Sequence, residues 1–153
     1  MSASTTKRPK RLWVMVGMNV LVTAINLGTI LYLLLGSSVP AAFAKTPISA
    51  ISSAALPVIL LTSSIFCLWG YRTAHAVTLT AALLFYGTVC AQHVAMLLAQ
   101  DSNFTASVVL KLRAGVLRSL IEIGVNLWAL LSPKTRSFFS ASAIAPNYRL
   151  ERP

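Results

Sequence analysis

Acidic residues are almost missing from this sequence. Three Asp and Glu stand among 153 residues, against thirteen Lys and Arg. Because the three acids, Asp101, Glu122 and Glu151, are far apart, the paired carboxylates that many hydrolases use for acid and base catalysis are excluded. The patterns H-E-x-x-H and G-x-S-x-G and the nucleotide-binding glycine patterns are missing as well. We therefore expect no enzymatic activity, no cofactor and no bound metal.

Cysteines are equally few. Cys67 and Cys90 form no C-x-x-C pair, and both lie within apolar segments that place them at different depths, so we expect free thiols rather than a disulfide. Cys90 and His93, three residues apart, would share a helix face. Without a third group to orient the histidine, this is a weak candidate for a nucleophile and its base.

Charged residues make up only 10% of the chain, whereas 56% of the residues are hydrophobic. The mean hydropathy of +0.74 is far above what a soluble domain of this length tolerates, so the sequence predicts a membrane protein. A net charge of +10 could suggest nucleic-acid binding if the basic residues formed one patch. They cluster between apolar runs instead, as topology-setting charges do, so we expect the lipid bilayer and no nucleic acid as a partner.

Four apolar segments predict an all-α fold, an integral membrane four-helix bundle. At about 1.5 Å per residue, each is long enough to cross a hydrocarbon core of about 30 Å. The predicted transmembrane helices are 12–36, 48–71, 74–99 and 107–131. The short connection at Arg72 and Thr73 makes the second and third an antiparallel hairpin, and Ser132 with Pro133 ends the fourth.

The remaining segments are expected outside the hydrocarbon. Residues 1–11 form a basic tail, and 37–47 and 100–106 form external loops. Residues 132–153 begin with a basic and aromatic stretch, KTRSFF, that suits an anionic leaflet, and the end of this segment is predicted to be disordered.

The basic residues predict the orientation. With the N-terminus inside, nine of them fall on the cytoplasmic side and three outside, and Arg118 lies within the last segment. The nine are Lys7, Arg8, Lys10, Arg11, Arg72, Lys134, Arg136, Arg149 and Arg152, and the three are Lys45, Lys111 and Arg113. The positive-inside rule therefore predicts that both termini are cytoplasmic, and it puts Trp13, Trp69 and Trp128 toward the inner interface. The layout resembles that of many small bacterial inner-membrane proteins, which implies that location.

A cleaved signal peptide is an alternative for the first segment. The stretch VPAAFA offers a small-residue site ending at Ala44, and cleavage there would leave three spans. Because the apolar run is well beyond the 7–15 residues of a typical signal peptide, we expect the first segment to remain as a span.

The fourth segment has one polar face. At about 100° per residue, six residues fall within an arc of about 100°. They are Lys111, Gly115, Arg118, Ser119, Glu122 and Asn126. A lone charge at the middle of a span costs about 2.5–3.5 kcal/mol, so we expect Arg118 and Glu122 to pair at i and i+4, to turn inward and to be covered by other helices.

Other segments offer matching polar residues. Asn19 and Asn26 lie on one face of the first segment, and Tyr86 and His93 on one face of the third, whose His75 is expected at the inner boundary in contact with solvent. We predict that Arg118 and Glu122 face Asn19, Asn26 and Tyr86. The candidate polar core is Arg118, Glu122, Asn126, Asn19, Asn26, Tyr86 and His93. Such residues most often form hydrogen bonds between helices, and a proton relay is the alternative.

Two functions fit these residues. Short loops and a mostly lipid-embedded chain favour a non-enzymatic protein that binds another membrane component, in an accessory, assembly or immunity-type role, or that associates with itself. The alternative is a small proton- or solute-coupled transporter acting as a homo-oligomer through Glu122. In size and in its single membrane acid the chain is similar to the small multidrug-resistance family, but that family's glutamate lies in the first span, so no residue is carried over.

Overall fold

The structure is a computed structural model that describes residues 8–35, 47–99 and 105–144. It contains five helices in these ranges, and the described residues contain no strand. The helices are α1 (Lys10–Leu35), α3 (Pro47–Leu68), α4 (Arg72–Leu98), α5 (Ala106–Leu130) and α6 (Pro133–Ile144). The all-helical prediction is confirmed for this part of the chain. Most of the two expected external loops, the cleavage position at Ala44 and both ends of the chain lie outside the described residues.

The helices have the length and composition of a membrane protein. Lys10–Tyr32 and Thr73–Leu98 are each long and apolar enough to cross a membrane. Ala106–Leu130 and Pro133–Ser140 pass the same test together, with a bend of 52° between them, and Ala54–Leu68 is a shorter apolar helix. The structure therefore contains two candidate spans, or three if the bent pair is one span.

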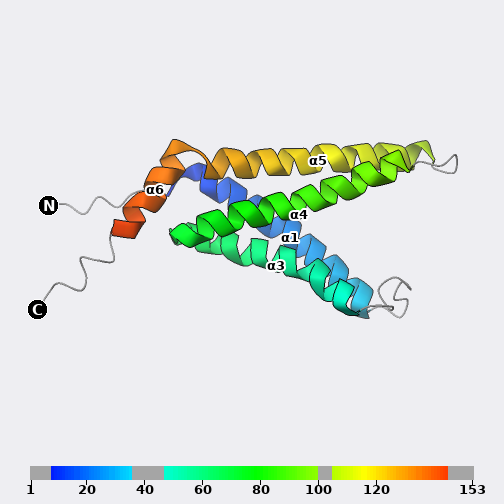
Figure 1. Cartoon of the computed structure of the whole chain (residues 1–153), viewed down its shortest axis with the longest axis horizontal. Coiled ribbons are helices and arrows are strands. Elements are labelled where there is room, and N and C mark those ends of the chain that lie inside the picture. Colours follow the sequence, from blue (N-terminus) through cyan, green and yellow to red (C-terminus); the bar gives the residue numbers. More distant parts are fainter. Residues whose placement is uncertain (1–7, 36–46, 100–104, 145–153) are drawn as a thin grey trace, which may run out of the picture.

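Four long helices form two antiparallel hairpins (Figure 1). α1 packs on α3, α3 on α4, and α4 on α5, whereas α1 and α5 contact each other over a shorter stretch. The two hairpins, α1 with α3 and α4 with α5, approach each other near α6 and diverge toward their opposite ends. The bundle is therefore closed at the end where the described chain begins and α6 lies, and open at the other.

The turn between α3 and α4 differs slightly from the prediction. α3 ends at Leu68, and the amide of Gly70 donates to the carbonyl of Cys67 at 3.1 Å. Gly70 has φ 81°, a left-handed conformation that glycine adopts without the steric penalty of a side chain. The helix thus stops at a glycine cap, and Arg72, expected in the connection, is the first residue of α4.

The segment after α5 is not the surface stretch that the sequence predicts. Ser132 and Pro133 do end α5, but the backbone amide of Thr135 donates to the Ser132 hydroxyl at 3.4 Å and to its carbonyl at 3.0 Å. Ser132 therefore caps a new helix. Pro133 fits the first position because a backbone amide there has no partner within the helix, so the amide hydrogen that proline lacks is not needed. The helix α6 continues to Ile144, so the start of the tail that was expected to be disordered is helical.

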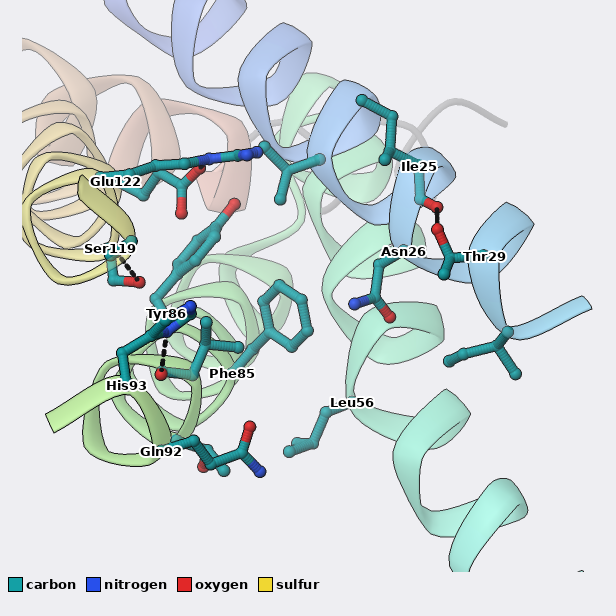
Figure 2. Close-up of a pocket in the computed structure, with 16 residues that line it drawn as sticks. Ile25, Asn26, Thr29, Leu56, Phe85, Tyr86, Gln92, His93, Ser119 and Glu122 are labelled. Atoms are coloured by element: carbon teal, nitrogen blue, oxygen red, sulfur yellow. Dashed lines mark hydrogen bonds and ion pairs between the residues drawn. The ribbon is translucent and has the colours of Figure 1, made fainter. Parts of the chain in front are cut away.

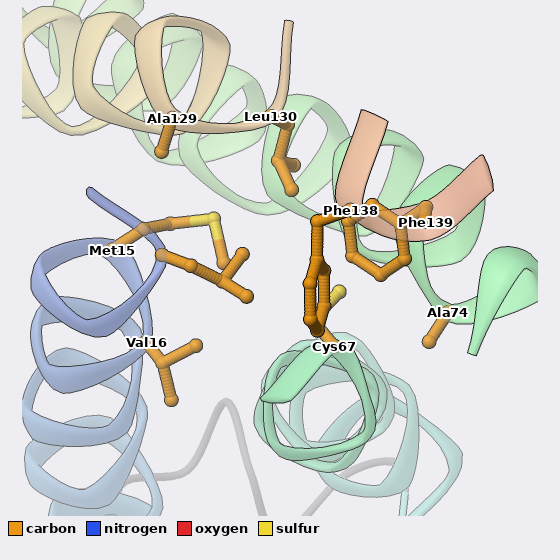
Figure 3. Packing of buried hydrophobic residues seen from close by; sticks show 9 residues of the cluster. Met15, Val16, Cys67, Ala74, Ala129, Leu130, Phe138 and Phe139 are labelled. Atoms are coloured by element: carbon orange, nitrogen blue, oxygen red, sulfur yellow. The ribbon is translucent and has the colours of Figure 1, made fainter. Parts of the chain in front are cut away.

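The two phenylalanines of α6 close one end of the bundle (Figure 3). The stretch KTRSFF predicted that these rings contact an anionic leaflet, but Phe138 and Phe139 are buried. They pack in an apolar cluster with residues of all four long helices. Its other members are Leu12, Met15, Val16, Cys67, Ala74, Ala129 and Leu130. The physical reason is that two adjacent aromatic rings bury more apolar area among these helices than they would at the membrane surface.

Candidate functional site

One hydrogen-bond network joins all four long helices. The amide nitrogen of Asn19 on α1 donates to the side-chain oxygen of Asn126 on α5 at 2.9 Å and to the hydroxyl of Ser64 on α3 at 3.0 Å. In return, Asn126 donates to the Asn19 oxygen at 3.1 Å, and the Tyr86 hydroxyl of α4 donates to the same oxygen at 2.9 Å. Each helix therefore contributes one polar side chain to a single buried cluster.

This network leaves no polar atom unpaired. Asn19, Ser64, Tyr86 and Asn126 are all buried, and among the described residues no buried side-chain nitrogen or oxygen lacks a partner. Asn126 also donates to the Glu122 carbonyl at 2.9 Å. Full satisfaction matters because a buried amide without a partner costs about 1–3 kcal/mol.

One turn along α5, Arg118 and Glu122 form the predicted ion pair. Arg118 Nε donates to Glu122 Oε1 at 2.8 Å. The side chain of Glu122 is 9% exposed, but that of Arg118 is 61% exposed. The expectation that other helices cover both residues is therefore wrong for Arg118, because the diverging hairpins leave its outer part uncovered.

The open space beside this pair is a cleft of about 650 Å³ between the two hairpins (Figure 2). Its polar lining includes Asn26, Thr29, Gln92, His93, Arg118 and Glu122. Its apolar lining includes Val22, Ile25, Leu56, Phe85 and Val89. Figure 2 shows Tyr86 and His93 of α4 on one side and Ile25 and Asn26 of α1 on the other. Tyr86 connects the two parts of the site, since it lines the cleft and donates to Asn19.

His93 is held by close contact between α4 and α5. Its Nδ1 lies 2.7 Å from the carbonyl of Val89, one turn earlier, so Nδ1 carries a proton and donates. A Cβ added to Gly115 would lie 2.5 Å from His93 Nε2 and 2.6 Å from Cδ2. Gly115 therefore lets the imidazole lie directly against α5.

The candidate residues divide into two groups. Asn19, Asn126 and Tyr86 meet in the network, and Asn26, His93, Arg118 and Glu122 line the cleft with Tyr86. Of the residues that Arg118 and Glu122 were predicted to face, Asn26 and Tyr86 line the cleft with them, whereas Asn19 lies in the network and is not part of the cleft lining. Asn26 faces the cleft as expected but makes no side-chain hydrogen bond with a described residue.

Sequence reasoning did not single out Ser64. The run Thr62-Ser63-Ser64 places three hydroxyls within an apolar segment, which was the available signal. Helix register then decides which of them faces Asn19: Thr62 bonds back to its own helix, and Ser64 faces the bundle.

His75 makes contacts that the sequence did not predict. It is partly buried, its Nε2 lies 3.0 Å from the carbonyl of Leu130 at the end of α5, and its ring packs edge to face on Phe139. His75 thus supplies a partner for a carbonyl that the helix end leaves free.

The cysteines are free thiols, as predicted. Cys67 is buried with its sulfur 3.2 Å from the Thr78 hydroxyl, and Cys90 is partly buried. His93 makes its hydrogen bond to Val89 and none to Cys90, so these two residues do not form a nucleophile and base pair. Within residues 8–35, 47–99 and 105–144, no group of three or more His, Cys, Asp or Glu could hold a metal ion.

Comparison with known proteins gives no relative: no family model, no curated protein and no solved structure matches this chain.

Proposed function

We propose that this protein is a non-enzymatic, multi-pass membrane protein that acts by binding another membrane component in the cleft between its two hairpins. The component would lie against Arg118, with the Asn19 network as the floor of the site. A binding role is favoured over catalysis because Glu122 is the single acidic residue in the described ranges, and it is paired with Arg118.

The topology belongs to this proposal. α1, α3, α4 and α5 would each cross the inner membrane of a bacterium, and both termini would be cytoplasmic. Aromatic residues support a membrane interface at the end of the bundle near α6: Trp13, Trp69 and Trp128 are about half exposed. Basic residues at the same end support the cytoplasmic side, among them Arg11, whose guanidinium lies 4.5 Å from the Trp128 ring centroid. A phosphatase reporter that needs the external side should be inactive when fused after Pro153, and activity there would contradict the orientation.

The exposure of Arg118 is the observation that carries the proposal. A charged side chain in the middle of a span costs about 2.5–3.5 kcal/mol when it faces hydrocarbon. Arg118 lies midway along α5 and lines the cleft, 61% of its side chain is exposed, and the protein itself supplies one partner, Glu122. A bound component that fills the cleft and pairs with the guanidinium would remove this cost.

Blocking the cleft tests the proposal. Thr29 lies on the cleft wall and is exposed, so Thr29→Trp would fill part of the space, whereas Thr80→Trp on the exposed face of α4 lies outside the cleft and is the matched control. We expect native mass spectrometry of tagged protein, gently extracted from its own membrane, to show a bound mass with the wild type and Thr80→Trp that Thr29→Trp loses. Equal retention by all three proteins would contradict cleft binding.

A small coupled transporter is the second candidate, and the observation that favours it is that Glu122 lines the cleft. Such a transporter would work as a homo-oligomer in which Glu122 exchanges protons. Glu122→Gln should then abolish coupled flux at normal abundance. In the binding role the same substitution should lower abundance, because Arg118 loses its counter-charge.

A further inference from the structure

We propose that the component bound in the cleft is a small amphipathic anion, a molecule with one carboxylate or phosphate group and an apolar chain. This inference rests on the proposed function, since it names the chemical class of the same occupant. Three features of the cleft carry it: the unused donors of Arg118, the apolar walls around them, and the volume.

The guanidinium of Arg118 has donors that no described residue uses. Arg118 uses Nε to bind Glu122 Oε1, and no other described residue accepts a hydrogen bond from this side chain. The two terminal nitrogens carry four further N–H groups in a planar fork that matches the two oxygens of a carboxylate or phosphate. Glu122 thereby acts as a positioning residue, because it fixes the Nε edge and leaves the outer edge free.

A cation is the less suitable occupant. The carboxylate of Glu122 is 9% exposed and already accepts from Arg118, so it offers little surface to a second positive group. Arg118, at 61% exposure, presents the accessible charge of the pair. The accessible charge in the cleft is therefore positive, although the pair as a whole is neutral.

The walls explain why the anion should carry an apolar chain. Val22, Ile25, Leu56 and Phe85 surround the polar residues, and each apolar group placed against them is removed from water. The volume of about 650 Å³ lies within the range of about 300–1,000 Å³ that is typical of small-molecule sites. It is too small for a whole transmembrane helix, which is about 10–12 Å across and about 30 Å long.

Binding of matched long-chain probes tests the inference. The full chain in phosphatidylcholine nanodiscs would be titrated with palmitate, hexadecyl phosphate and the uncharged hexadecanol, and binding measured by native mass spectrometry. We expect either anion to bind the wild type at least tenfold more tightly than hexadecanol. The double variant Arg118→Gln with Glu122→Gln, which removes both charges together and leaves neither unpaired, should lose this preference. Arg113→Gln, an exposed arginine of α5 outside the cleft, should keep it.

Each other outcome has a defined meaning. If hexadecanol binds as tightly as palmitate and Thr29→Trp blocks both, the cleft binds membrane components but the anionic class is wrong. If the preference for anions survives in the double variant, Arg118 does not recognise them and the inference is overturned. If no probe binds and Thr29→Trp retains the same native mass as the wild type, the proposed function fails as well.

The anion could be a free amphiphile or the headgroup of a membrane phospholipid, and a second arm separates these sources. Discs that contain phosphatidylglycerol should release protein with that lipid bound if the source is a phospholipid. Palmitate should bind regardless of phosphatidylglycerol if the source is a free amphiphile. If neither phosphatidylglycerol nor palmitate binds, the inference is overturned.

Discussion

Asn19 and Asn126 exchange two hydrogen bonds, of 2.9 Å and 3.1 Å, between their side-chain amides. They are 107 residues apart and belong to α1 and α5. Of the four pairs of long helices that pack side by side, α1 with α3, α3 with α4, α4 with α5 and α1 with α5, this last pair has the least extensive contact. The pair therefore joins the two hairpins where the packing between them is thinnest, directly below the cleft that Tyr86 also lines.

Asn19→Leu should destabilise the protein, whereas Asn26→Leu should not. Leucine at position 19 removes three side-chain partners at once and leaves Asn126, Tyr86 and Ser64 short of a hydrogen bond, so we expect a loss of about 2 kcal/mol. Asn26 is a matched asparagine on the same helix whose side chain makes no hydrogen bond with a described residue, and its replacement should change stability by less than about 0.5 kcal/mol. Thermal unfolding in one detergent compares the variants; equal losses would mean that the network does not hold the hairpins together.

Gly115→Ala should destabilise the protein, whereas Gly124→Ala should not. At Gly115 the new methyl group would collide with the His93 ring, and we expect a loss of about 1–3 kcal/mol. At Gly124 nothing lies within 4 Å of the added atom, so alanine should be neutral or should stabilise α5 by up to about 1 kcal/mol through its helix propensity. Thermal unfolding without chemical denaturant, followed by circular dichroism, measures the change in stability of both variants. A neutral Gly115→Ala would show that α4 and α5 are not in close contact at His93.

The sequence predicts the helices better than the space between them. Apolar runs predicted where α1, α3, α4 and α5 lie, and the i, i+4 spacing was sufficient to predict the pair Arg118 and Glu122. The divergence of the hairpins depends on contacts between residues far apart in the chain. It could not be read from periodicity, and for that reason the exposure of Arg118 was not foreseen.

The same distinction explains α6. Ser132 and Pro133 can end one helix and begin another. The residues that follow, KTRS, are polar and show no apolar periodicity, so the sequence does not indicate whether a second helix begins there. What stabilises α6 is the burial of Phe138 and Phe139 against helices that lie elsewhere in the sequence. Tertiary packing therefore decides the structure of this segment.

The two members of the ion pair should respond unequally to substitution. Arg118→Gln leaves a buried carboxylate without its partner and should cost about 2 kcal/mol, whereas Glu122→Gln leaves an arginine that is already largely exposed and should cost about 1 kcal/mol. The double variant should be more stable than Arg118→Gln alone, since it leaves no unpaired charge. A double-mutant cycle on unfolding free energies checks this. Strict additivity of the two single changes would contradict coupling between the side chains.

Phe139→Ala should release α6 without unfolding the bundle. The Phe139 ring is buried between His75 and the apolar cluster. Truncation of a buried phenylalanine costs about 3–5 kcal/mol. We expect this loss to exceed the stabilisation that the other side chains of the 12-residue helix α6 provide when it packs on the bundle. Trypsin should then cleave at Lys134 and Arg136 faster than in the wild type. Ser137→Ala, at an exposed position of the same helix, is the control. Unchanged cleavage in Phe139→Ala would show that the aromatic contacts do not hold α6 in place.

Photocrosslinking from the cleft wall tests the central claim most directly. A benzophenone side chain at Gln92 would face the cleft, and the same group at the neighbouring exposed Ala91 would lie outside it. After irradiation in native membranes, the binding account predicts one defined adduct mass from position 92 and a mixture of bulk lipid adducts from position 91. The same mixture from both positions would contradict a specific occupant of the cleft.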